Sequence, residues 1–290
     1  MTERFRPIIV IGAARSGTKL IRDLLAEHPL VNKVPYDVNY IWRLGNESVG
    51  HDELSPKTLG TKEKARIRRK LGKFSKGAPY LIEKTVSNCL RVGFVECVFP
   101  QALYIHLIRH GEDVIESAYR QWLSSPEWKY IFQKAKTFPV FQAFSYGASY
   151  AINTIQTTIM RGKGKVGTWG PRYAGIDEDV AAKALIEVCA IQWSRCVQMA
   201  VEGLGRLSES RVHEVRYEEF VEHPLKQLRK IASFFGIDPE PYADEAVMKK
   251  ITQRNVGKGV AMLSREERAL ILPHIKESMH MLGYDVARVP

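Results

Sequence analysis

An eight-residue segment near the N-terminus combines the residue types that bind a phosphate-like anion. Residues 12–19 have the sequence Gly-Ala-Ala-Arg-Ser-Gly-Thr-Lys, after an apolar run and before a segment with helical spacing. Backbone N–H groups at such a turn form an anion site together with the positive end of the helix dipole. Arg15, Ser16 and Thr18 add cationic and hydroxyl groups that a purely structural turn does not need. The segment therefore predicts a site for a phosphate-like group.

The residue order after the second glycine separates this segment from a Walker A loop. A Walker loop has Lys directly after that glycine and then Ser or Thr, so that the amine reaches the phosphates and the hydroxyl binds magnesium. Here Thr18 follows Gly17, and Lys19 comes after it. The sequence also lacks an apolar strand ending in Asp that would hold magnesium. We therefore expect an anion bound without a metal, with a magnesium-dependent phosphotransferase as the alternative.

A second pair of residues points to the same kind of ligand. Arg109 ends the apolar run 103–108, and Ser117 lies eight residues further on in a segment with helical spacing. Helical side chains tilt toward the N-terminus of their helix, so Ser117 can face the strand end from which Arg109 emerges. In open α/β sheets, ligands bind beyond the carboxyl ends of the strands. We expect Arg109 and Ser117 to share one anion.

The elements that must position these residues alternate between strands and helices. Apolar runs predict strands at 7–11, 80–82, 103–108 and 211–215. Helical spacing appears at 17–27, 88–99, 112–123, 224–235 and 264–282, whereas 28–56 has the composition of a loop. This alternation is typical of a parallel sheet with crossover helices. We expect one α/β domain over 1–290: a P-loop-like parallel sheet flanked by helices, a mostly helical acceptor-side insertion at about 125–210, and C-terminal helices.

The charge of the chain calls for an anionic partner. There are 43 Lys and Arg against 32 Asp and Glu, a net charge of +11. Residues 57–76 contain nine Lys or Arg and the single acid Glu63, so most of the excess lies there. A nucleic-acid-binding protein is the non-enzymatic alternative, but it leaves both anion motifs unexplained. We expect no nucleic acid partner, and a role for 57–76 at an anionic acceptor or in peripheral membrane contact.

The apolar runs and the cysteines predict a cytoplasmic protein. No apolar run approaches the roughly 18 residues of a spanning helix. The spacing of the cysteines suits neither a zinc ribbon nor CxxC chemistry. We expect no metal and no transmembrane segment, and reduced, mostly buried thiols at Cys89, Cys97, Cys189 and Cys196.

The two anion motifs together resemble a known family. Residues 12–18, followed by an apolar helix and His-Pro at 28–29, are similar to the 5′-phosphosulfate-binding loop of sulfotransferases that use 3′-phosphoadenosine 5′-phosphosulfate (PAPS). Residues 109–117 resemble the family's 3′-phosphate-binding motif, with Gly111 where Pro is common. The resemblance implies PAPS as donor and 3′-phosphoadenosine 5′-phosphate (PAP) as product. The donor-binding residues that it implies here are Arg15, Ser16, Gly17, Thr18, Lys19, Arg109 and Ser117.

Three further segments extend the resemblance over most of the chain. Glu83-Lys84-Thr85 resembles a stretch of tyrosylprotein and carbohydrate sulfotransferases whose Lys is aimed at the leaving group. Residues 215–236 resemble the family's C-terminal donor-side segment, which implies a donor contact for Tyr217. Gly-Lys-Gly at 257–259 resembles a shortened closing loop without its usual aromatic residue, and implies a donor contact for Lys258.

Sulfuryl transfer by in-line displacement needs two kinds of help. Cations and N–H groups stabilise the charge that accumulates on the departing nucleotide, and a base removes the proton of the attacking hydroxyl. Arg15 and Lys84 suit the first task. Asp37 lies near the position of the catalytic carboxylate in the enzymes that this chain resembles, and we expect it to be the base. The alternatives for the base are Glu83, His28 and His110.

The acceptor is indicated by aromatic residues alone. Aromatic side chains stack on sugar faces, which favours a carbohydrate or glycolipid acceptor over a small phenol, while a peptide tyrosine remains the alternative. The aromatic residues concerned are Tyr36, Tyr40, Trp42, Trp122, Trp128 and Trp169.

Overall fold

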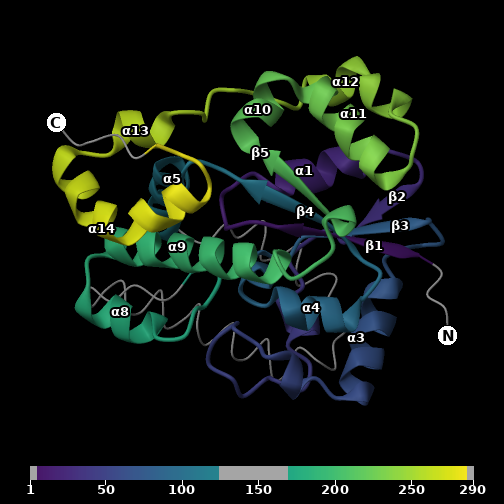
Figure 1. The fold of residues 1–290 in the computed structure, drawn as a ribbon, viewed down its shortest axis with the longest axis horizontal. Coiled ribbons are helices and arrows are strands. Elements are labelled where there is room, and N and C mark those ends of the chain that lie inside the picture. The colour runs from purple at the N-terminus through teal and green to yellow at the C-terminus, as the bar shows by residue number, and fades with distance from the viewer. Residues whose placement is uncertain (1–4, 124–168, 286–290) are drawn as a thin grey trace.

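A parallel sheet forms the centre of the computed structural model, which describes residues 5–123 and 169–285 (Figure 1). Its five strands have the order β2-β3-β1-β4-β5, and every neighbouring pair is parallel. The strands are β1 (Arg6–Ile11), β2 (Val31–Lys33), β3 (Tyr80–Glu83), β4 (Leu103–Ile108) and β5 (Val212–Arg216). The predicted P-loop-like α/β fold is therefore confirmed.

One face of the sheet is covered by α1 (Thr18–Leu25), α10 (Tyr217–Glu222) and α11 (Pro224–Phe235), which lie above the strands in Figure 1. Side chains of a strand alternate between its two faces. Ile8 and Val10 of β1 are fully buried on this side and pack against these helices. Every second residue of the apolar run in β1 is therefore buried by these helices; a run that is apolar at every position needs helices on the other face as well.

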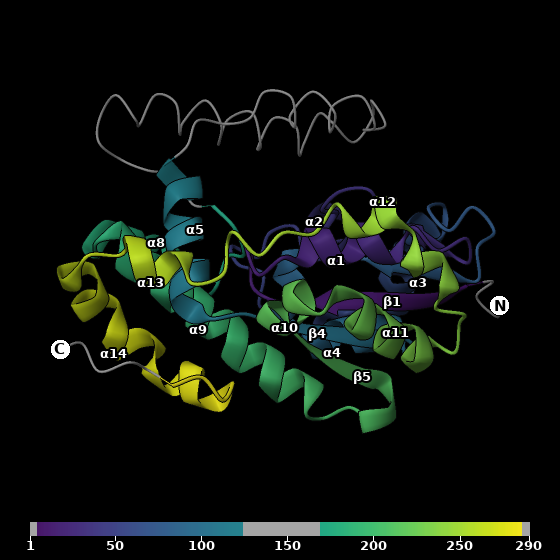
Figure 2. The same cartoon turned by 90° about the horizontal axis from the view of Figure 1, so that it is seen from above.

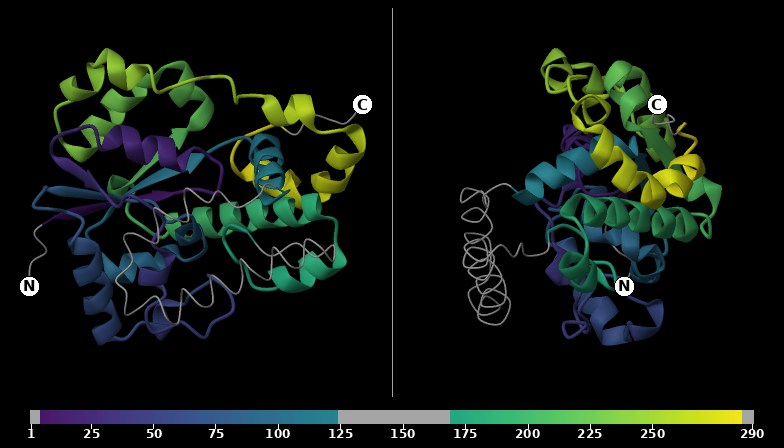
Figure 3. Two further views of the ribbon diagram at one scale, coloured as in Figure 1. Left: turned by 180° about the vertical axis from the view of Figure 1, so that it is seen from behind. Right: turned by 90° about the vertical axis from the view of Figure 1, so that its left-hand side faces the viewer.

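The other face is covered mainly by α4 (Val92–Val98) and the long helix α9 (Leu185–Leu204). The intervening side chains of β1, Ile9 and Ile11, are buried in this second core. The view from behind in Figure 3 shows α9 running across the sheet on this side. Helices therefore cover both faces of the sheet. In open α/β sheets, ligands bind beyond the carboxyl ends of the strands, so we expect the site at this edge.

The remaining elements surround this sandwich. The other α-helices are α2 (Asn39–Trp42), α3 (Thr61–Gly72), α5 (Gly111–Leu123), α8 (Ile176–Ala182), α12 (Glu245–Met248), α13 (Lys258–Met262) and α14 (Arg265–Met281). The short 3-10 helices of the described residues are η1 (Pro56–Thr58), η2 (Val86–Leu90), η3 (Glu209–Arg211) and η4 (Glu240–Ala243). Helices α5, α13 and α14 lie together beyond the carboxyl end of β4, as Figures 1 and 2 both show.

Local sequence signals account for several helix ends. Pro224 is the first residue of α11, and Gly236 ends that helix in the left-handed conformation with φ 73°. Ser264 and Glu267 form the predicted capping box at the start of α14: the Glu267 amide donates to Ser264 Oγ at 3.1 Å.

Three sequence predictions about the elements need correction or stay open. The predicted loop 28–56 contains β2, whose three residues are recognised as a strand only through their pairing with β3. The predicted helix 88–99 is two helices, η2 and α4, separated at Arg91 with φ −153°. The single domain over 1–290 and its insertion at 125–210 stay predictions, because residues 124–168 lie outside the described residues.

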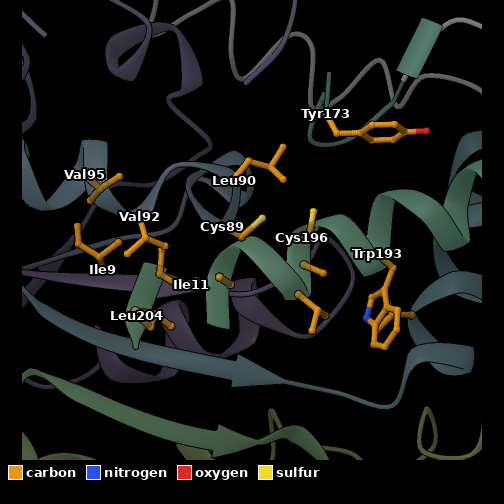
Figure 4. Packing of buried hydrophobic residues seen from close by; sticks show 14 of the residues in the cluster. Ile9, Ile11, Cys89, Leu90, Val92, Val95, Tyr173, Trp193, Cys196 and Leu204 are labelled. Carbon is orange, nitrogen blue, oxygen red and sulfur yellow. The ribbon is translucent and has the colours of Figure 1, made fainter. Parts of the chain in front are cut away.

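The four cysteines are free thiols, and three of them are buried, as predicted. Cys89 and Cys196 lie in the core on the α9 side of the sheet, where η2 meets α9 (Figure 4). Burial raises the pKa of the Cys189 thiol to about 12, which keeps it protonated and unreactive. Within residues 5–123 and 169–285, none of the helices combines the length and the apolar character of a membrane span.

Candidate active site

The turn between β1 and α1 has the backbone geometry of an anion cradle. Arg15 and Gly17 both adopt positive φ, 74° and 95°. A Cβ on Gly17 would lie 2.6 Å from the Tyr217 ring, so only glycine fits at this position. In the described part of the chain, the amides of Gly17, Thr18 and Lys19 have no protein acceptor. These amides open the eight-residue helix α1 and form an N-terminal anion site.

The two predicted anion motifs, residues 12–19 and 109–117, meet at this turn. Arg15 Nε donates to Ser117 Oγ at 2.9 Å, across 102 residues of sequence. Arg109 Nη1 donates to the carbonyl oxygen of Arg15 at 3.0 Å. The carboxyl ends of β1 and β4 lie side by side in the sheet, which explains the convergence. Arg15, Arg109 and Ser117 therefore form one cluster.

Arg109 is the most deeply embedded cation of this cluster. It is only 6% exposed, and its guanidinium lies 4.4 Å from the centre of the Tyr217 ring. Its Nε is buried without a hydrogen-bond partner among the described residues. A buried, unpaired donor beside unpaired helix amides is what a bound anion would satisfy. The residues present therefore fit the phosphate groups of a nucleotide donor.

Tyr217 and Lys258 frame the cluster from the C-terminal half of the chain. Tyr217 opens α10 and packs its ring between Gly17 and Arg109. Lys258 is the first residue of α13. In the loop just before it, the Asn255 carbonyl accepts from Arg109 Nη2. Lys19 lies in the first turn of α1 with an exposed side chain. The structure thus brings all of the predicted donor-side segments to one edge of the sheet.

Lys84 and Asp37 form a second cluster at the ends of β3 and β2. Lys84 Nζ lies 3.9 Å from Asp37 Oδ2, and both side chains are largely buried, 14% and 20% exposed. Asp37 accepts from the backbone amides of Asn39 and Val86, each at 3.1 Å. Burial lowers the pKa of Lys84, and the Asp37 carboxylate opposes that shift. A carboxylate and a lysine are thereby held in fixed orientation beyond the end of β3, the strand that pairs with β1.

The rival bases lie in less suitable places. Glu83 is 1% exposed and is enclosed by Thr85 and Asn88, which donate to its carboxylate at 2.5 Å and 3.0 Å. His28 lies beyond the C-terminal end of α1, where its ring contacts the Asp238 carbonyl at 3.1 Å and accepts from the amide of residue 30. His110 packs edge-on against Tyr284. Of the two acids considered as the base, Asp37 is partly exposed and lies beside Lys84, whereas Glu83 is almost fully buried.

Burial raises the pKa of Glu83 to about 7, and the nearby Asp37 carboxylate adds to the shift. The folded protein therefore binds a proton at Glu83 that the unfolded chain releases between about pH 4.5 and pH 7. The free energy of unfolding should fall by about 3 kcal/mol as the pH rises through this window. Glu83→Gln should remove that part of the pH dependence.

Urea unfolding of wild type and Glu83→Gln at several pH values measures the effect. Glu178→Gln, a change at an exposed acid of α8, is the control and should follow the wild-type curve. Parallel curves for wild type and Glu83→Gln would show that Glu83 does not titrate in this window.

Two of the aromatic residues that predicted the acceptor are core residues. Trp42 is fully buried and Trp122 is 3% exposed, so neither can stack on a sugar. Tyr36, Tyr40 and Trp169 are partly buried and pack against the same core, with part of each side chain accessible. Trp128 lies outside the described residues. The aromatic basis for a carbohydrate acceptor is therefore reduced to three residues.

Three residues that shape these clusters were not predicted from the sequence. Thr85 and Asn88 enclose Glu83, and Asp113 lies 3.3 Å from Arg109 Nη2. A signal for Asp113 was present, because it follows Arg109 by four residues, the spacing of neighbours on a helix. Thr85 and Asn88 gave no comparable signal, since their contacts depend on the turn into η2.

Comparisons with known proteins agree with this geometry. A profile of the sulfotransferase family matches residues 46–140 and 171–241, more than half of the chain. A 130-residue stretch is 29% identical to an uncharacterized protein of Aquifex aeolicus; the match covers 40% of this chain and only 17% of that protein. The chain thus spans a small part of the curated relative that it matches.

Solved structures show the same fold. The sulfotransferase domain from the curacin biosynthetic pathway superposes with a TM-score of 0.55 at 16% identity, covering 97% of this chain and 99% of that one. Mouse sulfotransferase SULT7A1, solved in complex with PAP, superposes with a TM-score of 0.50 at 15% identity, covering 96% and 87%. With the profile match over more than half of its length, this chain belongs to the sulfotransferase family.

Proposed function

We propose that this protein transfers a sulfuryl group from PAPS to a hydroxyl group of an acceptor. The observation that carries the proposal is the convergence of Arg15, Ser117 and Arg109 on the unpaired amides that open α1. When bound, PAPS supplies an activated sulfuryl group whose transfer needs no metal. Within the described residues, no cluster of metal-ligating side chains is found.

The donor-binding residues in this proposal come from four parts of the chain. Arg15, Ser16, Gly17, Thr18 and Lys19 would hold the 5′ side of the donor, and Arg109, Ser117, Tyr217 and Lys258 would hold the 3′-phosphate side. The backbone N–H groups at the α1 terminus and the fixed cations are preorganised, so they stabilise negative charge without rearranging.

The catalytic residues in this proposal are Arg15, Lys84 and Asp37. Arg15 and Lys84 would stabilise the charge that develops on the leaving nucleotide. Asp37 would accept the proton of the acceptor hydroxyl, and its two backbone hydrogen bonds fix its orientation for that task. The 3.9 Å distance between Lys84 Nζ and Asp37 Oδ2 supports assigning these two roles to neighbouring side chains.

For the acceptor, we favour a carbohydrate or glycolipid over a peptide tyrosine. The accessible parts of Tyr36 and Tyr40 support this proposal, because both follow β2 on either side of Asp37. Sugar rings offer flat apolar faces for such side chains. The free thiols support a cytoplasmic location, since reducing compartments keep thiols unpaired.

Calorimetric titration with PAP tests the donor proposal. In buffer containing EDTA, we expect PAP to bind with a dissociation constant in the micromolar range, roughly −8 kcal/mol. ATP with magnesium is the comparison ligand, because a phosphotransferase would prefer it. Tighter binding of magnesium-ATP than of PAP would contradict the proposal and favour the phosphotransferase alternative.

The basic segment 57–76 adds a proposed partner. Lys62, Arg66, Arg69 and Lys73 are exposed and recur at helical spacing along α3, and none of them forms an ion pair with the described residues. Burial and the neighbouring Arg66, Lys73 and Arg69 lower the pKa of Lys70. These four exposed residues form a cationic row, and such a row is typical of a surface that binds anions.

The position of α3 separates this row from the donor site. Gly72, at the end of α3, packs close to the Phe5 ring beside the start of β1, whereas the anion turn follows the end of β1 (Figure 1). We propose that the row docks on an anionic lipid surface, where each Lys or Arg contributes about 1 kcal/mol.

Charge reversal tests this docking surface. Arg66→Glu with Arg69→Glu should lower the fraction of protein bound to vesicles containing anionic lipid by about 10-fold or more, because two favourable contacts become repulsive. Lys230→Glu with Arg229→Glu, on exposed positions of α11, is the matched control and should bind as wild type. Unchanged vesicle binding by the α3 variant, or equal binding of wild type to neutral vesicles, would contradict the proposal.

A further inference from the structure

A buried acid, Asp113, connects the first turn of α5 to the loop that precedes α13. Asp113 is 1% exposed. Its Oδ1 accepts from the Gly259 amide at 2.6 Å, and its Oδ2 accepts from the Gly257 amide at 2.9 Å. The carboxylate therefore caps the N-terminus of α13 from a different helix, across about 145 residues of sequence.

The loop is built for this close approach. A Cβ on Gly259 would lie 2.2 Å from the carbonyl oxygen of Glu112, so no larger residue fits against α5 there. Gly257 has φ 71°, which favours glycine. Helix α13 accordingly lies beside the start of α5 in Figure 2. Two glycines and one carboxylate thus fix residues 257–259 on α5.

The same carboxylate also orients Arg109. Asp113 Oδ2 lies 3.3 Å from Arg109 Nη2, and that nitrogen donates in addition to the carbonyl of Asn255. The other guanidinium nitrogen, Nη1, donates to the carbonyl of Arg15. Arg109 therefore ties the anion turn to the loop, and Asp113 is the acid that neutralises and positions this guanidinium.

We propose that Asp113 is a positioning residue for recognition of the 3′-phosphate of the donor. It holds the loop 255–259, and with it Lys258, against Arg109, so that cations from two distant segments form one anion site. The proposal rests on the proposed function, since it assumes a nucleotide that carries a 3′-phosphate. We do not expect Asp113 itself to contact the donor.

Asp113→Asn should weaken binding of the 3′-phosphate selectively. Asn has the shape of Asp but not the negative charge that interacts with the amides of Gly257 and Gly259 and with the Arg109 guanidinium. We therefore expect the loop, and Lys258 with it, to move away from Arg109. We expect the affinity for PAP to fall about 10- to 100-fold, the usual effect of removing a charged partner from a buried hydrogen-bonded group. The affinity for AMP, which lacks only the 3′-phosphate, should change by less than about threefold.

Calorimetry with PAP and with AMP on the full chain measures this selectivity. Glu112→Gln is the matched control: Glu112 neighbours Asp113 on α5, but its carboxylate pairs with Arg268 Nε at 3.7 Å. Gly259→Ala perturbs the same contact from the loop side and keeps Asp113 intact. Both Asp113→Asn and Gly259→Ala should lose the preference for PAP over AMP, and Glu112→Gln should keep it.

Hydrogen exchange gives a readout that does not need the ligand. In Asp113→Asn, the amides of Gly257 and Gly259 should exchange at least about 10-fold faster than in wild type, because their acceptor is weakened. Equal loss of PAP and AMP affinity, or unchanged exchange at these two amides, would overturn the inference. If the wild type itself fails to prefer PAP over AMP, the proposed donor is wrong, which the wild-type titration alone reveals.

Discussion

Asp37→Asn lowers the turnover number by about two to four orders of magnitude and leaves the affinity for PAP near the wild-type value. Asn cannot accept the proton of the acceptor hydroxyl, but it keeps an oxygen that accepts from the amides of Asn39 or Val86. The local backbone is therefore expected to stay in place. Steady-state transfer kinetics and PAP calorimetry on the same preparation separate the two effects.

Glu83→Gln is the informative comparison for Asp37. Glu83 follows β3 directly before Lys84, but its carboxylate is enclosed by Thr85 and Asn88 and has almost no exposure. An acceptor hydroxyl cannot reach it, so Glu83→Gln should keep turnover within about threefold of wild type at pH 7.5. Full activity of Asp37→Asn together with an inactive Glu83→Gln would transfer the role of base to Glu83.

Lys84→Met lowers turnover by about two to three orders of magnitude, the usual effect of removing one preorganised donor from a developing negative charge. Met retains the length and the apolar packing of the lysine stem. The loss therefore reports the ammonium group, which lies 3.9 Å from Asp37 Oδ2 in a largely buried position. Single-turnover transfer measures the chemical step directly.

Lys33→Met is the matched control for Lys84. Lys33 ends β2, the strand next to β3, and pairs with Asp23 at 2.8 Å. It resembles Lys84 in charge and in place at a strand end, but it faces α1. Turnover of Lys33→Met should stay near wild type. Equal losses in the two variants would indicate a general effect of positive charge at this edge of the sheet.

The pattern of the strands was predictable because it is local. Apolar runs at β1 and β4 are explained by burial on both faces, and the anion turn and the capping signals involve neighbours in sequence. The strand β2 was not predictable, since Val-Asn-Lys has no apolar run and depends on pairing with β3.

The candidate site also contains residues that local sequence patterns predict and residues that they do not. Arg15, Arg109 and Ser117 were found from strand-end positions and helical spacing, and they meet because β1 and β4 are neighbours. The contact of Asp113 with Gly257 and Gly259 joins segments about 145 residues apart, so no local pattern reports it. Burial of Trp42 in the core likewise depends on the packing around α2, not on its neighbours in sequence.

Transfer of radiolabelled sulfate from PAPS is the direct test of the proposed sulfuryl transfer. Wild-type protein in EDTA is incubated with labelled PAPS and a panel of glycans, glycolipids and tyrosine peptides. We expect labelled acceptor, with the highest yield for a carbohydrate or glycolipid, and one PAP released for each sulfate transferred. Absence of label in every acceptor, together with magnesium-dependent turnover of ATP, would contradict it.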